Sequence, residues 1–145
     1  MKDLIEPRII EAVRKLLCGR VNELLGEMEC IVPLIEFSNY RGGAVISPVI
    51  ALSSCEQSEK ERIIRLEAYS LAITLSLPES PENELLCYAY AGAVTRAFYD
   101  DPTLGGLVDR VVITGKKYVQ PKKPNCGEGW GLVISLRITT EAKAE

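Results

Sequence analysis

The stretch that decides the fold runs from Leu85 to Tyr118 and reads LLCYAYAGAVTRAFYDDPTLGGLVDRVVITGKKY. An alanine-rich apolar segment is followed by a short polar turn and then by a run of β-branched residues. Pro102 cannot continue a helix, and Gly105 and Gly106 readily take positive φ, so the chain should stop, turn and re-enter as a strand. Small side chains in the apolar segment permit close backbone approach. We therefore expect a helix that packs on a sheet.

A second amphipathic helix is predicted near the start of the chain, over residues 3–25. Its apolar residues recur at three- and four-residue steps: Ile5, Ile9, Val13, Leu16, Leu17, Val21 and Leu24. Asp3 and Glu6 resemble a capping box, Pro7 offers an alternative start near Glu6, and Gly26 is a suitable stop. The apolar stripe should cover the protein's own sheet, although the same pattern fits a partner-binding surface.

Three strands are expected between these helices. Two apolar runs flank the sequence SNYRGG at 38–43, which suits a hairpin or a wide turn. Pro33 and Pro48 remove amide donors, so these strands should lie at a sheet edge or be irregular. The polar residues 53–65 read as a loop. Residues 66–77 then alternate strictly, with large apolar side chains on one face and small ones on the other. The face with large side chains should be core, and the face with small side chains suits solvent or a neighbouring subunit.

The rest of the chain supplies the start of the second helix and a closing strand. Ser80 should cap this helix, with Pro81 at its first position. Residues 119–129 read as a loop, 130–139 as a final antiparallel strand, and the tail from about 141 as frayed. The coarse order is α-β-β-β-α-β-β, which predicts an α+β domain with a mainly antiparallel sheet and two helices packed on one face.

The composition indicates a single globular domain over 1–145. The chain has 145 residues, enough to bury a core, and its 47% hydrophobic and 26% charged residues are ordinary for such a domain. No apolar run is long enough to span a membrane and no signal-peptide core is present, so we expect a cytoplasmic protein. The cysteines form an odd set without Cys-x-x-Cys spacing, which favours reduced thiols over a disulfide framework or a zinc cluster. They are Cys18, Cys30, Cys55, Cys87 and Cys126.

Little in the sequence points to catalysis or to a cofactor. The chain has no histidine, which removes the commonest general base and the commonest zinc ligand. Its glycine clusters lead into strands and match neither the P-loop nor the dinucleotide-binding fingerprint. Asp100, Asp101 and Asp109 supply fewer oxygen ligands than a cation site needs. Cys55, in a polar segment, is the only thiol that we expect to be exposed, and it has no base nearby. We expect neither an enzyme nor a metal or cofactor site.

The charge is unevenly distributed along a chain whose net charge is −3. That net charge argues against a nucleic-acid binder. Between Asp109 and Glu128, however, the chain carries several basic residues and no acid: Arg110, Lys116, Lys117, Lys122 and Lys123. The proline-containing segment 116–129 reads as a long loop. The lysines are therefore either solvated loop surface or a contact with an acidic neighbour.

The motif Asp101-Pro102-Thr103-Leu104-Gly105-Gly106 follows an alanine-rich helix and precedes a valine-rich strand. In this setting it resembles the tail terminator (tail completion) proteins of long-tailed bacteriophages and prophages. The resemblance implies a small α+β protein that assembles as a hexameric ring, ends the tail tube and joins it to the head connector. It implies fold or interface roles, and no catalytic ones, for Asp101, Thr103, Leu104, Gly105 and Gly106.

The partners implied by the resemblance are further copies of the chain, the tail tube protein and the head-tail connector protein, with no membrane and no sequence-specific nucleic acid. It also implies assembly in the host bacterial cytoplasm and a final location in the virion tail. The alternative is a small, non-catalytic ligand-binding or regulatory α+β domain. The native mass discriminates between the two, because only the first requires a ring.

Overall fold

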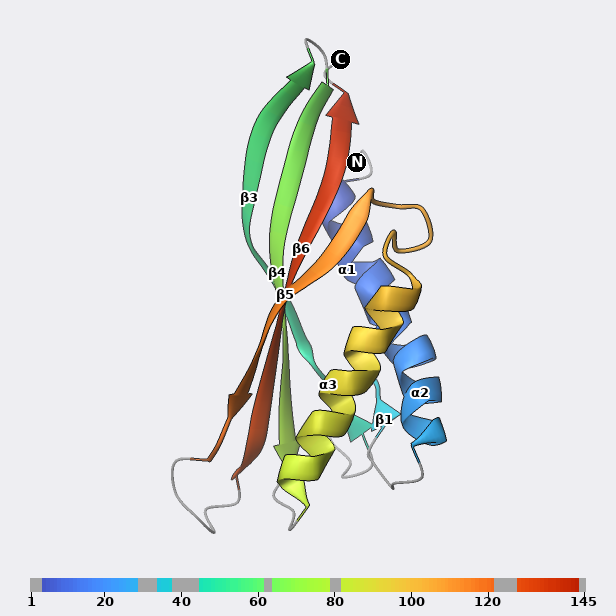
Figure 1. Ribbon diagram of the computed structural model, residues 1–145, viewed down its shortest axis with the longest axis vertical. Coiled ribbons are helices and arrows are strands. Elements are labelled where there is room, and N and C mark those ends of the chain that lie inside the picture. Colours follow the sequence, from blue (N-terminus) through green and yellow to red (C-terminus); the bar gives the residue numbers. More distant parts are fainter. Residues whose placement is uncertain are drawn as a thin grey trace.

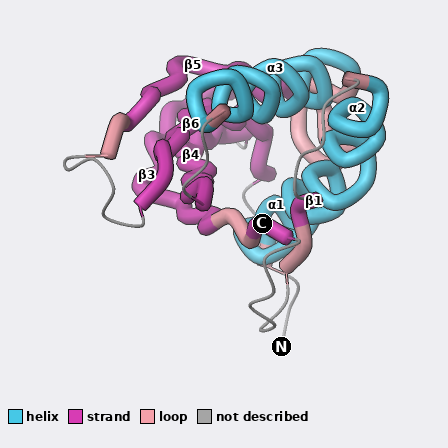
Figure 2. The backbone as a smooth tube through the Cα atoms, turned by 90° about the horizontal axis from the view of Figure 1, so that it is seen from below, coloured by secondary structure: helices cyan, strands magenta, loops and turns pink. Residues whose placement is uncertain are grey.

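The computed structural model has an α+β fold in which helices cover one face of a four-stranded antiparallel sheet (Figure 1). Figure 2, turned by 90°, shows the two layers, with the strands β3 to β6 on one side and the helices on the other. The predicted fold class is thereby confirmed. The structure describes residues 4–28, 34–37, 45–61, 64–78, 82–121 and 128–143.

The N-terminal helical rod consists of α1 (Ile5–Leu16), the π-helical turn η1 (Leu17–Val21) and α2 (Asn22–Glu27). The backbone stays right-handed helical at both junctions, so the three segments are continuous. The helix predicted over 3–25 is confirmed from residue 5 onward and ends one residue after Gly26. A π-bulge interrupts the regular helical repeat locally. Apolar periodicity alone therefore does not reveal it.

Two short strands follow the rod, β1 (Leu34–Ile35) and β2 (Val45–Ile46), and they pair in parallel. A hairpin at this point is therefore wrong, because the strands of a hairpin run antiparallel. A parallel pair requires a wider connection than a tight hairpin turn allows. The sequence at 38–43, which we read as hairpin or wide turn, lies outside the described residues.

A long pair of antiparallel strands comes next, β3 (Val49–Glu61) and β4 (Ile64–Pro78). The loop predicted over 53–65 is wrong for its described part, because β3 continues through it as far as Glu61. This half of β3 is polar and exposed on both faces, so it lacks the alternation that reveals a strand. A bulge between Leu52 and Ser54 shifts the pairing with β4.

The last three elements are α3 (Asn83–Asp100), β5 (Arg110–Val119) and β6 (Glu128–Lys143). Among the described residues, four strands precede α3, one more than expected. The sheet order is β3-β4-β6-β5, and every neighbouring pair is antiparallel. The predicted cap at Ser80 and Pro81 lies outside the described residues.

The closing strand β6 is longer than the 130–139 predicted from its alternation. The tail was expected to be frayed from about residue 141. Instead, Glu141 pairs with Leu66 and Lys143 pairs with Ile64. The strand is extended because β4 offers it a partner as far as Ile64. Residues near the end of a chain are often frayed, but here their pairing with β4 keeps them in a regular strand.

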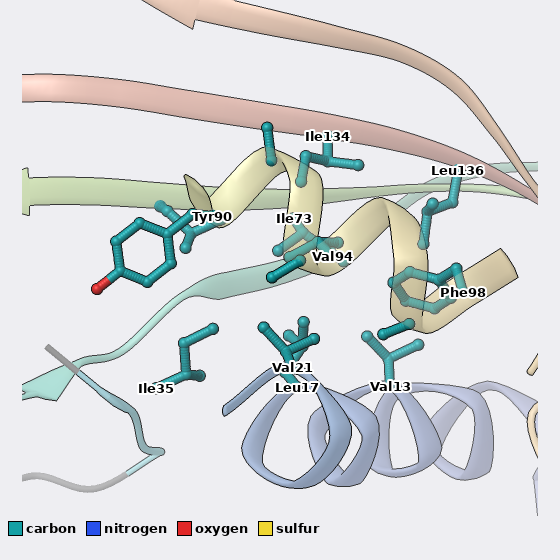
Figure 3. Close-up of a cluster of buried hydrophobic side chains, with 14 of the residues drawn as sticks. Val13, Leu17, Val21, Ile35, Ile73, Tyr90, Val94, Phe98, Ile134 and Leu136 are labelled. Carbon is teal, nitrogen blue, oxygen red and sulfur yellow. The ribbon is translucent and has the colours of Figure 1, made fainter. Parts of the chain in front are cut away.

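The core lies between the helices and one face of the sheet (Figure 3). Val13, Leu17 and Val21 of the rod point toward α3, and Val94 and Phe98 of α3 lie between the rod and the strands. The predicted alternation is confirmed, because its large apolar residues are all buried in β4: Tyr69, Leu71, Ile73, Leu75 and Leu77. Their small neighbours point to the opposite face, which the helices leave uncovered: Ala68, Ser70, Ala72, Thr74 and Ser76.

The sheet extends beyond the helix layer. In Figure 1 the upper ends of β3, β4 and β6 project past the start of α1. Tyr69 marks this boundary, because its hydroxyl lies 3.1 Å from Oε1 of Glu6 in the first turn of α1. Cys55 of β3 is paired with Tyr69, and beyond this point β3 is exposed from Glu56 to Glu59. The molecule therefore presents an uncovered sheet face and a projecting β3–β4 end.

Candidate functional site

The turn between α3 and β5 is built by the polar side chains of the motif. Oδ1 of Asp101 accepts a hydrogen bond from the N–H of Gly105 at 2.9 Å, and Oγ1 of Thr103 accepts one from the N–H of Gly106 at 3.1 Å. The N–H of Val108 donates to the Thr103 carbonyl at 3.1 Å. Short Asp and Thr side chains often stabilise turns in this way. The motif residues are thus brought together, and their contacts hold the turn.

Three consecutive residues of this turn have positive φ: Leu104 at 50°, Gly105 at 70° and Gly106 at 87°. This conformation strains a residue such as leucine, and it persists only where the surroundings enforce it. Here the Leu104 side chain is buried in the core. A Cβ added at either glycine would meet no atom within 4 Å. Glycine at these positions therefore serves backbone conformation and does not make room for a neighbour.

Asp100, the residue before the motif, joins α3 to the N-terminal rod. Its carboxylate lies 3.4 Å from a guanidinium nitrogen of Arg20 and 3.2 Å from Nε of Arg96. Arg20 also contacts Glu23 at 3.2 Å. The Asp100 and Arg20 side chains are each 35% exposed, so the pair contributes about 1 kcal/mol or less. The pair is a contact between the two helices beside the turn.

Two of the three aspartates considered for a cation, Asp100 and Asp101, are occupied by these contacts. Asp100 pairs with two arginines and Asp101 accepts a backbone N–H. Across the described ranges, no group of three histidine, cysteine, aspartate or glutamate side chains is arranged to hold a metal ion. In the same ranges, no helix is both long and apolar enough to cross a membrane.

The predicted basic loop is in part a strand. Lys116 and Lys117 are exposed residues of β5, paired with Ile134 and Val133 of β6, so their assignment to a loop is wrong. The alternation is obscured because a bulge between Ile113 and Gly115 shifts the register and this end of β5 is exposed on both faces. Lys122 and Lys123 lie outside the described residues.

A shallow groove runs between α3 and the first half of β5. Its volume is about 570 Å³. The lining is mainly apolar and aromatic, with one cation: Thr95, Phe98, Tyr99, Pro102, Arg110, Val111, Val112 and Ile113. Tyr99 is 82% exposed, which is unusual for a large aromatic residue. Further along the same side, the rings of Tyr88 and Tyr118 meet edge to face with centroids 5.4 Å apart.

The projecting part of β3 is polar and acidic. Glu56 and Glu59 are exposed there, and Glu56 lies 3.7 Å from Arg137 of β6. Both side chains of this pair are at least half exposed, at 77% and 50%, so the contact is weak and Glu56 stays accessible. The sequence did not reveal this acidic edge, because a strand with two polar faces resembles a loop.

Tyr69 and Cys55 lie on the helix-covered face near this end of the sheet. The Tyr69 hydroxyl is 2.7 Å from Oε2 of Glu67 and 3.1 Å from Glu6, and Sγ of Cys55 is 3.7 Å from Glu67. Burial and the adjacent Glu67 raise the pKa of Tyr69 well above its ordinary value. Partial desolvation of its thiol is also the main cause of a raised pKa at Cys55, although the residue as a whole is exposed. A thiol held in its protonated form is a poor nucleophile.

The cysteines in the described part of the chain are free thiols. Cys87 is buried, whereas Cys18 and Cys55 are exposed, so the expectation that Cys55 alone is exposed is wrong. Burial raises the pKa of Cys87. Cys30 and Cys126 lie outside the described residues.

A comparison with protein-family models gives no match, and a comparison with curated proteins gives none either.

Proposed function

We propose that this chain is a structural protein of a long-tailed bacteriophage or prophage, and that its copies form a hexameric ring. The ring ends growth of the tail tube and joins the tube to the head connector. The observation that carries the proposal is the motif at 101–106, in its setting between an alanine-rich helix and a valine-rich strand. Its residues form one hydrogen-bonded turn, which agrees with a fold or interface role.

The surface of the fold supports assembly. The sheet face opposite the helices carries small side chains such as Ala72, Thr74 and Ser135, which let another surface approach closely. The β3–β4 end projects beyond the helices (Figure 1). A protein that works through contacts needs such open surfaces more than it needs a cleft with convergent polar groups.

The partners in this proposal are further copies of the chain, the tail tube protein and the head-tail connector protein. Assembly takes place in the host bacterial cytoplasm, and the ring then resides in the virion tail. No catalytic step and no cofactor are required. The exposed lysines of β5 are available for an acidic partner surface.

Native mass spectrometry and electron microscopy of the purified chain, alone and mixed with assembled tail tubes, test the proposal. We expect closed rings at high concentration or caps at tube ends. Rings of this kind can require the tube as a template, so a monomer in dilute solution alone does not decide the matter. A monomer at high concentration that also fails to bind tubes would overturn the proposal.

The groove between α3 and β5 favours the alternative, a small non-catalytic ligand-binding or regulatory domain. Its volume of about 570 Å³ is within the range of small-molecule sites. A monomer whose melting temperature rises with one member of a metabolite panel, and falls back when Tyr99 is replaced by serine, would support this second function.

A further inference from the structure

Both outer edges of the sheet lack a neighbouring strand in the described ranges. β3 pairs with β4 alone and β5 with β6 alone. The N–H of Val111 donates to the Pro102 carbonyl at 2.6 Å, so the turn occupies the start of the β5 edge. From Ile113 to Val119, no other described segment pairs with that edge. Neither strand contains a proline to block pairing, and such edges are templates for another chain.

The two edges carry opposite charge. β3 contains three glutamates and one lysine, whereas β5 contains Arg110, Lys116 and Lys117 and no acid. Glu56 and Glu59 are exposed, as are the three basic residues of β5. Opposite charges facing each other across two strands stabilise the pair, and like charges destabilise it. One edge of the sheet thus complements the other.

The strand directions also match. Each of the three neighbouring pairs in the sheet is antiparallel, so strand direction alternates and β3 runs opposite to β5. When a second copy with the same orientation is placed beside the first, its β3 runs antiparallel to the β5 it meets. The sheet can therefore continue from one copy to the next without a change of pattern.

We propose that the β5 edge of one copy pairs with the β3 edge of the next, with Lys117 opposite Glu56. In this register Lys116 is diagonal to Glu59, within reach of its long side chain. The partner is a second copy of this chain. The contact is heterologous, and it closes into a ring if the rotation between copies permits. Only the closure into a ring rests on the proposed function, and the pairing of the two edges does not.

The proposed register requires an offset between copies. Within one sheet, Lys117 is level with Val49, through Val133 and Thr74. To meet Glu56 it must move along the strand direction relative to the next copy. Sheets that close on themselves have such a stagger between strands, so the offset agrees with a closed assembly.

Charge reversal tests the edge pairing. The first variant carries Lys116→Glu and Lys117→Glu, and the second carries Glu56→Lys and Glu59→Lys. Each variant alone faces like charge across the contact, so its concentration at half-assembly should rise by about tenfold relative to the wild type. An equal mixture should assemble like the wild type, because each edge then meets its opposite. Arg8→Glu with Lys15→Glu, on α1, changes the net charge as the first variant does and should leave assembly unchanged.

Carbodiimide cross-linking of the wild type tests directly whether Lys117 and Glu56 are in contact between copies. Mixing isotope-labelled and unlabelled chains and mapping the linked peptides should yield a Lys117–Glu56 link between copies. If the wild type forms rings that respond to neither charge variant, the edge pairing is overturned and the ring proposal stands. If edge-linked open chains form but do not bind tail tubes, the edge pairing stands and the tail function falls. If the wild type gives no cross-link between copies at high concentration, the edge pairing is overturned. The tail function is then tested separately, by binding to tail tubes.

Discussion

The side-chain amide of Asn22 forms a two-way hydrogen bond with the backbone of Ile35. Nδ2 donates to the Ile35 carbonyl at 2.9 Å, and Oδ1 accepts from the Ile35 N–H at 2.9 Å. The same Nδ2 lies 3.0 Å from the carbonyl of Cys18, in the preceding turn of the rod. One side chain therefore holds the short strand β1 against the junction of η1 and α2.

Replacing Asn22 with aspartate should destabilise the fold by about 1–3 kcal/mol, because a carboxylate cannot donate to the two carbonyl oxygens. The free energy of unfolding in urea measures this. Glu23→Gln is the matched control at the next position, where the side chain is exposed and the expected change is within about 0.5 kcal/mol. Equal stability of the two variants would show that the Asn22 contacts do not hold β1.

Gly106→Ala should cost about 1–2 kcal/mol, because the backbone there has φ of 87° and an L-residue is strained in this region. Gly26→Ala is the control. Gly26 lies in α2, where alanine favours the helix by up to about 1 kcal/mol, and an added Cβ meets no atom within 4 Å at either position. Opposite shifts in melting temperature are expected. A shift of the same sign in both would mean that φ at Gly106 is not the cause.

The sequence predicted the parts of this fold in which one side of an element is buried. The alternation of β4 and the periodicity of the N-terminal rod arise from burial, and the motif at 101–106 has the residues that its turn requires. These patterns were sufficient for the α+β class and for helices on one face.

The missed features are those that burial does not mark. The outer half of β3 and the end of β5 are exposed on both faces, so their residues carry no period of two. The parallel pairing of β1 and β2 is a long-range relationship between two strands of two residues each, too short to show a pattern. The acidic and basic edges of the sheet are formed by those strands. Because the strands were read as loops, Lys116 and Lys117 were assigned to a loop and Glu56 was not predicted to lie at a sheet edge.

Tyr69→Phe should reduce the loss of stability at alkaline pH. Burial raises the pKa of Tyr69 in the folded protein above its unfolded value near 10. The folded state therefore binds more protons than the unfolded state above pH 10, and this contribution to stability disappears as pH rises. Urea unfolding from pH 8 to 11 measures the effect. The slope should be shallower for Tyr69→Phe, whereas Tyr99→Phe, at a ring 82% exposed, should keep the wild-type slope. Parallel curves for all three proteins would exclude Tyr69 as the titrating group.

Replacing the lysines in pairs distinguishes the contribution of β5 to assembly from the contribution of the segment that follows it. Lys116→Gln with Lys117→Gln and Lys122→Gln with Lys123→Gln each remove two positive charges. Replacing Lys116 and Lys117 should not unfold the protein, since both are exposed on β5 and changes at exposed surface positions usually stay within about 0.5 kcal/mol. Self-association and tube binding should weaken for the first pair and fall further when all four lysines are replaced. The deficit should be largest at low salt, because the screening length shrinks from about 30 Å at 0.01 M to about 10 Å at 0.1 M. Sedimentation across a salt series measures it. If the four-lysine variant assembles like the wild type at every salt concentration, these lysines are solvated surface with no partner.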